Sequence, residues 1–195
     1  MRDRKRGQVA IFPALPASRS TEFLYQTLVV VSASLFVALC ARVTLPLPFT
    51  PVPLTLQNFG VLAVGMTLGS RRGAAALALY LAEGALGLPV FNPAGAGGVA
   101  QILGPTGGYL LAYPAVAYVA GMGRERGFTR LLGAGIAAEV VLFAGGVAWL
   151  FLLTGSARLA AQFGALPFVF AEVIKIMLAA GAADRWQRFR SGSKA

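Results

Sequence analysis

The sequence predicts an all-α, polytopic membrane protein with six transmembrane helices and with its N- and C-termini in the cytoplasm. Three observations support this fold class. Hydrophobic residues make up 57% of the 195 residues, and the mean hydropathy is +0.71. Charged residues make up only 12%, about half of the ~25% usual in soluble proteins. Six apolar runs alternate with short basic or Gly- and Pro-rich segments. We therefore expect one multi-pass domain in the cytoplasmic (inner) membrane.

The six runs are delimited in order by residues that end a helix or that a bilayer disfavours. They cover residues 23–43, 54–68, 74–90, 108–121, 131–154 and 163–182. The first ends at the Pro-rich segment 45–53, because proline cannot continue a helix. Arg71 and Arg72 separate the second from the third, and the Gly-rich segment 91–107 follows the third. Arginines follow the fourth, and a turn at 155–161 follows the fifth. The second and fourth are shorter than the ~20 residues of a perpendicular span and require flanking residues, tilt or a thinner bilayer.

Basic residues set the expected orientation of these spans. Those on one side of the predicted bundle are Arg2, Arg4, Lys5, Arg6, Arg19, Arg71, Arg72, Arg124, Arg126, Arg130, Arg185, Arg188, Arg190 and Lys194. The opposite side holds only Arg42 and Arg158. Cytoplasmic loops carry an excess of Lys and Arg. We therefore expect a cytoplasmic tail over residues 1–22, a membrane domain over 23–183 and a cytoplasmic basic tail over 184–195.

The same composition argues against several other classes of function. The net charge of +10 comes from clusters between apolar runs, which is typical of membrane topology and not of nucleic-acid binding. The chain has no histidine, a single cysteine and no H-E-x-x-H, G-x-S-x-G or nucleotide-binding motif, so the commonest general base and zinc ligand is missing. We predict a protein that is not an enzyme and that has neither a cofactor nor a metal site.

Four ionisable residues lie inside the predicted spans: Glu83, Glu139, Glu172 and Lys175. Insertion scales place such a charge at roughly 2.5–3.5 kcal/mol at a helix centre. Glu172 and Lys175 are three residues apart and share one helix face, which predicts a polar binding site. Lys175 suits an anionic ligand group such as a carboxylate, and Glu172 suits an N–H donor. The alternative is an ion pair that satisfies itself and binds no ligand.

Four other polar or aromatic positions are candidates, each with a structural alternative. Glu83 has a ligand-binding or gating role, or else it accepts a hydrogen bond from nearby backbone or hydroxyl groups. Gln57 and Asn92 both offer a donor and an acceptor, although Asn92 precedes Pro93 and also suits a turn. Tyr109 either stacks on a ligand or serves as an interfacial anchor.

Four motifs resemble the BioY family, the biotin-binding S-components of energy-coupling factor (ECF) vitamin transporters. They are T-P-V-P-L-T-L-Q-N-F (Thr50 to Phe59), E-G-A-L-G-L-P-V-F (Glu83 to Phe91), G-P-T-G-G-Y (Gly104 to Tyr109) and E-V-I-K (Glu172 to Lys175). The resemblance covers about residues 28–182. It implies high-affinity capture and uptake of biotin, held as the transported substrate. It also implies membrane lipid, a transmembrane coupling protein and two cytoplasmic ATPases as partners.

The resemblance also implies site residues. In the family the acidic and lysine positions of the last helix bind ligand, as does an asparagine after the third span. The acidic residue is often Asp in the family, so Glu172 is a longer variant. The family's A-x-x-x-A packing motif on the first helix is matched only by Ser34 with Ala38. The predicted substrate-binding residues are Glu172, Lys175, Asn92, Gln57, Tyr109 and Glu83.

Other functions remain open from the residues themselves. The chain could be an S-component for another small vitamin. It could also be an ion channel or a proton-coupled carrier with Glu83, Glu139 and Glu172 as a relay. An intramembrane enzyme would have to work from glutamate and hydroxyl side chains alone.

Overall fold

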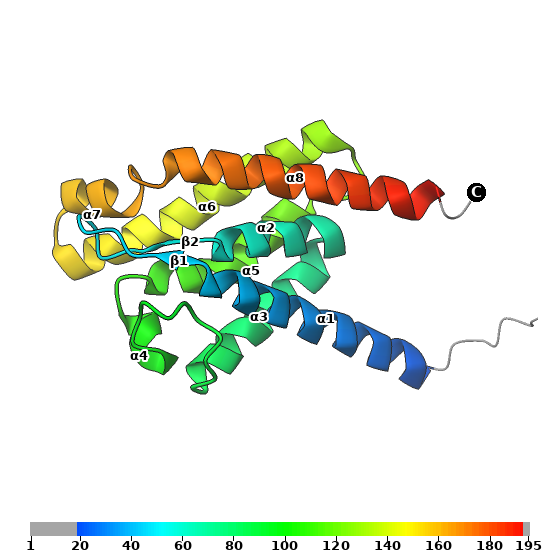
Figure 1. Cartoon of the computed structure of the whole chain (residues 1–195), viewed down its shortest axis with the longest axis horizontal. Coiled ribbons are helices and arrows are strands. Elements are labelled where there is room, and N and C mark those ends of the chain that lie inside the picture. The colour runs from blue at the N-terminus through cyan, green and yellow to red at the C-terminus, as the bar shows by residue number, and fades with distance from the viewer. Residues whose placement is uncertain (1–18, 193–195) are drawn as a thin grey trace, which may run out of the picture.

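The computed structural model describes residues 19–192, and within this range the chain is mostly helical. Its elements are α1 (Arg19–Arg42), β1 (Thr44–Leu45), β2 (Leu54–Thr55), α2 (Gln57–Leu68), α3 (Ser70–Ala85), α4 (Gly98–Leu103), α5 (Gly107–Gly121), α6 (Phe128–Thr154), α7 (Ala157–Gly164) and α8 (Val169–Gly192). The start of α1 and the end of α8 lie at one end of an elongated bundle, and α4, α7 and the strands lie at the other (Figure 1).

The six longest helices fall on the six predicted runs, with differences at their ends. The third run was predicted to reach residue 90, but α3 ends at Ala85 because Gly87 turns the chain with φ +90°. The sixth was predicted from residue 163, but α8 begins at Val169, after Pro167. The helix then continues through most of the predicted basic tail. The predicted N-terminal tail up to residue 18, with its basic residues, and Lys194 lie outside the described residues.

Two helices among the described residues are long and apolar enough to cross a membrane, α1 and α6. A third span results if α7 and residues 169–191, bent by 48° between them, act as one. Large apolar side chains on the long helices face outward, among them Phe23, Leu39 and Phe170, which are 74%, 69% and 79% exposed. Such a continuous apolar exterior is typical of a surface that contacts lipid. The chain is therefore a helical membrane protein.

Small residues bring α2, α3 and α5 into close contact at the centre of the bundle. A side chain at Gly65 on α2 would overlap the carbonyl oxygen of Ala117 on α5. A Cβ at Gly73 on α3 would lie 3.0 Å from Cα of Gly65. Close backbone approach at small residues is the usual way in which membrane helices pack. This contact fixes α5 between its neighbours and so sets the distance between the walls of the site.

The Pro-rich connection between α1 and α2 forms a minimal antiparallel hairpin. Thr44 pairs with Thr55, and Leu45 pairs with Leu54. The pairing stops after two residues per strand because prolines occupy positions 46, 48, 51 and 53 and have no N–H for a ladder. The hairpin lies at the end of the bundle that carries α4 and α7 (Figure 1).

Side-chain hydrogen bonds tie the connections at this end to the helices. The hydroxyl of Thr50 donates to the carbonyl oxygen of Phe163 at 2.7 Å, which fastens the Pro-rich loop to the end of α7. The guanidinium of Arg42 donates to the carbonyl oxygens of Pro89 and Phe91, the latter at 3.0 Å. Loops that are distant in sequence are therefore held together over one end of the bundle.

Candidate substrate-binding site

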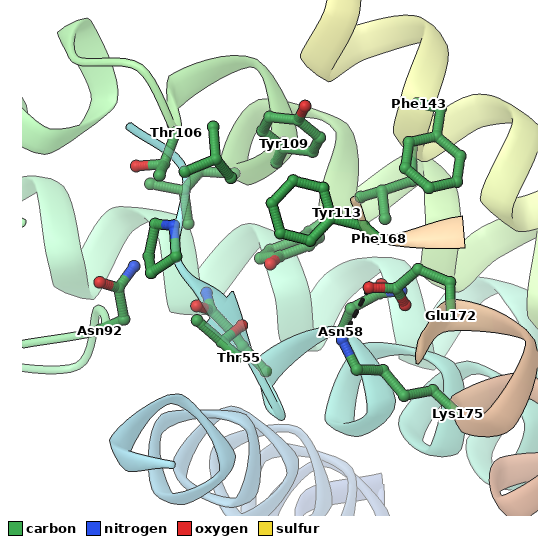
Figure 2. Close-up of a pocket in the computed structure, with 15 residues that line it drawn as sticks. Thr55, Asn58, Asn92, Thr106, Tyr109, Tyr113, Phe143, Phe168, Glu172 and Lys175 are labelled. Carbon is green, nitrogen blue, oxygen red and sulfur yellow. Dashed lines mark hydrogen bonds and ion pairs between the residues drawn. The ribbon is translucent and has the colours of Figure 1, made fainter. Parts of the chain in front are cut away.

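A cavity lies among α2, α5, α6 and α8, just beneath the connections described above. Together with its mouth it has about 500 Å³ of empty space. The lining residues are Val52, Pro53, Thr55, Gln57, Asn58, Asn92, Thr106, Tyr109, Leu110, Tyr113, Leu142, Phe143, Phe168, Glu172 and Lys175. Figure 2 shows Glu172 and Lys175 on one side, Asn92 on the opposite side, and aromatic side chains along the wall between them. This combination of an apolar wall and a few polar groups is typical of a small-molecule site.

Tyr109 is a fixed part of the aromatic wall. Its ring is buried, and its hydroxyl donates to the carbonyl oxygen of Gly164 at 2.6 Å. The ring lies against Gly146 on α6, where any side chain would overlap it. This burial favours a place in the cavity wall over an anchor at the membrane surface. The contact of Tyr109 with a ligand stays a prediction.

Glu172 and Lys175 form the ion pair that the sequence left as an alternative, and both also line the cavity. Nζ of Lys175 lies 2.6 Å from Oε1 of Glu172, and only 6% of Glu172 and 7% of Lys175 are exposed. The two residues share one face of α8, one helical turn apart. The ammonium of Lys175 is thus already engaged by Glu172, while both side chains keep a place in the cavity wall.

Asn58 and Glu139 extend this pair into a buried polar cluster. Nδ2 of Asn58 donates to Oε1 of Glu139 at 2.5 Å and to Oε2 of Glu172 at 2.7 Å. The cluster joins α2, α6 and α8. Sequence reasoning did not select Asn58, although the adjacent pair Gln57 and Asn58 at the start of an apolar run was a usable signal. Glu139 was given less weight than Glu172, and only the fold shows that they share one partner.

Asn92 and Gln57 both line the cavity, but each already holds part of the fold. Oδ1 of Asn92 accepts from the backbone N–H of Ala94 at 3.2 Å, so the predicted turn-forming alternative is present. Its amide group remains on the cavity side opposite Lys175 (Figure 2). Nε2 of Gln57 donates to the hydroxyl of Tyr80 at 2.8 Å. Both residues therefore combine a structural contact with a position in the wall.

Glu83 lies apart from the other predicted site residues. It does not line the cavity, and its carboxylate accepts a hydrogen bond from the hydroxyl of Ser34 on α1, as the structural alternative foresaw. Its substrate role stays a prediction without support from its position. The proposed relay with Glu139 and Glu172 is interrupted, since only those two share a partner. Ser34 is also the residue that matches the family's packing motif on the first helix. It is wholly buried, so it lies against α3 and not on a free face of α1.

Comparisons with known proteins agree on one family. The sequence profile of the BioY family matches residues 15–192. A protein from Pyrococcus horikoshii named "Probable biotin transporter BioY" is 40% identical over 158 residues, which cover 79% of this chain and 93% of the relative. "Biotin transporter BioY" from Thermotoga maritima is 38% identical over 161 residues, covering 81% of this chain and 95% of the relative.

A solved structure supports the fold independently. The crystal structure of "the S-component for biotin from an ECF-type ABC transporter" superimposes with a TM-score of 0.77. The match covers 86% of this chain and 93% of the other, at 23% sequence identity. The helical arrangement described above is therefore the fold of that S-component.

Proposed function

We propose that this chain captures biotin for uptake across a membrane. The proposal starts from the family, because the chain belongs to the BioY family. The observation that carries the proposal is the cavity among α2, α5, α6 and α8. Its walls combine one buried ion pair, several amides and four aromatic rings. The function is one of binding and transport and not of catalysis, and biotin is its substrate.

The chemistry of the cavity suits biotin. Biotin has a ureido ring with two N–H donors and one carbonyl acceptor, an apolar thiophane ring and a carboxylate on an aliphatic chain. The wall offers polar groups on two opposite sides, around Glu172 and around Asn92, with Tyr109 and Tyr113 between them (Figure 2). An elongated ligand that is polar at both ends and apolar in the middle is complementary to this arrangement.

We propose further that the chain spans the cytoplasmic membrane six times, with both ends inside. The charge distribution supports this orientation. Gln187 on α8 donates to the carbonyl oxygen of Met66 at 3.1 Å and accepts from the backbone N–H of Glu125 at 3.0 Å. The basic α2–α3 and α5–α6 connections therefore lie beside the basic end of α8. Because basic ends face the cytoplasm, the cavity lies toward the outer side.

The proposed transport cycle combines this orientation with what membership of the family implies. Biotin enters from outside, beneath the Pro-rich and Gly-rich connections that border the cavity. The sequence has no nucleotide-binding motif, so a partner must supply the energy. The proposed partners are two cytoplasmic ATPases and a transmembrane coupling protein, and the chain reorients in the bilayer against the coupling protein.

The test is uptake of radiolabelled biotin by cells that lack their own biotin transporter. Cells that express the chain with an ECF module should accumulate biotin, and a tenfold excess of thiamine, riboflavin or folate should not compete. Lys175→Met should abolish accumulation, whereas Arg185→Met, an exposed position on the same helix, should not. Competition by another vitamin would replace biotin as the substrate. Uptake that follows a proton gradient without ATPases would identify a proton-coupled carrier instead.

A further inference from the structure

The amide of Asn58 has its orientation fixed by two buried carboxylates. Nδ2 lies 2.5 Å from Oε1 of Glu139 and 2.7 Å from Oε2 of Glu172. An amide nitrogen carries two hydrogens, and an ionised carboxylate only accepts. Both hydrogens are therefore used, and a flipped amide would place its oxygen against the carboxylate of Glu172, which is held in the ion pair with Lys175. The carbonyl oxygen is the part of Asn58 that remains for another partner.

That carbonyl oxygen has no hydrogen-bond donor within the described part of the chain. Asn58 is only 4% exposed, and it lines the cavity. Buried acceptors are nearly always paired in proteins, and leaving one unpaired is unfavourable. Both oxygens of the neighbouring Glu172 already have a donor, one from Lys175 and one from Asn58. Oε2 of Glu139 also lacks a donor, but Glu139 is not among the residues that line the cavity, so the unpaired acceptor in the cavity wall is Asn58 Oδ1.

The charge of the cluster indicates which end of a ligand it receives. The single ammonium of the cluster, of Lys175, is already paired with Glu172, and Glu139 joins them through Asn58. A ligand carboxylate placed here would find no free cation and would lie close to other carboxyl oxygens in a poorly screened environment. A neutral group that donates N–H hydrogen bonds faces no such repulsion and supplies the donor that Asn58 lacks.

We propose that Asn58 accepts a hydrogen bond from a ureido N–H of the substrate and so determines specificity, and that Glu139 is the positioning residue that fixes its amide. This inference rests on the proposed function, biotin binding. It places the ureido ring against the cluster of Asn58, Glu139, Glu172 and Lys175. The carboxylate of biotin then points toward the side of the cavity that holds Asn92.

The experiment compares equilibrium binding of three ligands to the purified full-length chain in detergent. The ligands are biotin, biotin methylated on a ureido nitrogen (each of the two isomers) and the neutral biotin amide. Wild type should prefer biotin over one methylated isomer by roughly 10- to 100-fold, the effect of losing a hydrogen bond to a buried acceptor. Asn58→Ala should lower biotin affinity and reduce that preference to about twofold.

Two further variants separate specificity from folding. Glu139→Gln keeps the size of the side chain but can donate, so the amide of Asn58 is free to flip. It should reduce the preference for biotin over the methylated isomer while the chain remains folded by size-exclusion chromatography. Glu22→Gln, an exposed carboxylate on α1, is the matched control and should leave all three affinities unchanged.

The biotin amide tests the orientation. Asn58→Ala and Lys175→Met should each weaken biotin and biotin amide by the same factor, since neither residue meets the carboxylate. The inference is overturned if Asn58→Ala and Glu139→Gln retain the full preference, or if Lys175→Met weakens biotin alone. Failure of the proposed function looks different, because a folded wild-type chain would then bind none of the three ligands, and this inference would fall with it.

Discussion

Replacing Lys175 by methionine tests whether the buried cluster is a coupled electrostatic unit. Methionine keeps the length and most of the apolar stem but removes the ammonium. Glu172 and Glu139 are then left with the amide of Asn58 as their shared partner and with no cation. The two side chains are buried, since only 6% of Glu172 and 5% of Glu139 are exposed. Breaking a buried pair by removal of one partner costs about 3–5 kcal/mol. The double variant Lys175→Met/Glu172→Gln removes both charges, so we expect it to recover more than half of this loss.

Thermal unfolding without ligand in detergent measures the effect, followed by the fluorescence of the two tryptophans. For a chain of this length, 1 kcal/mol corresponds to roughly 2–4 °C in Tm. Lys175→Met should therefore lower the Tm by roughly 6–20 °C. The exposed control Arg185→Met should shift it by less than about 2 °C. A Lys175→Met chain as stable as the control, or a double variant less stable than the single one, would refute the reasoning.

Two further predictions concern the walls of the cavity. Gly146→Val should push the ring of Tyr109 into the cavity, because a side chain at Gly146 overlaps that ring, and should weaken biotin binding at least about tenfold. Gly133→Ala on the same helix meets open space and is the control, and equal affinities in an equilibrium titration would contradict the prediction. Thr50→Val removes the hydrogen bond to Phe163, worth about 1 kcal/mol. It should speed biotin release roughly fivefold in a stopped-flow chase, and an unchanged rate would dismiss the loop as a barrier to exit.

Hydropathy alone predicted the long helices, because each carries an apolar run bounded by arginine, glycine or proline. The short helices α4 (Gly98–Leu103) and α7 (Ala157–Gly164) lie in segments predicted as loops. At six and eight residues they are too short to be stable alone, and their stability comes from packing on the longer helices. α2 and α5 are only 12 and 15 residues long, in keeping with the short second and fourth runs of the sequence.

The site was predictable where a residue is expensive to bury. Glu172 and Lys175 stood out because two charges in an apolar run require a partner or a ligand. Asn58 did not, because an uncharged amide at the start of a helix is unremarkable in sequence, and only the fold brings two carboxylates to it. Glu83 gave the same signal as Glu172, yet its partner is the hydroxyl of Ser34 on α1. Sequence identifies buried charges, but it does not tell which of them face a common cavity.

The most direct test of the central claim is an experimental structure of the purified chain with biotin bound. We predict biotin inside the cavity among α2, α5, α6 and α8, in contact with Tyr109, with its ureido ring against Asn58 and Glu172. Biotin bound elsewhere on the chain, or an empty cavity at saturating biotin, would contradict the account.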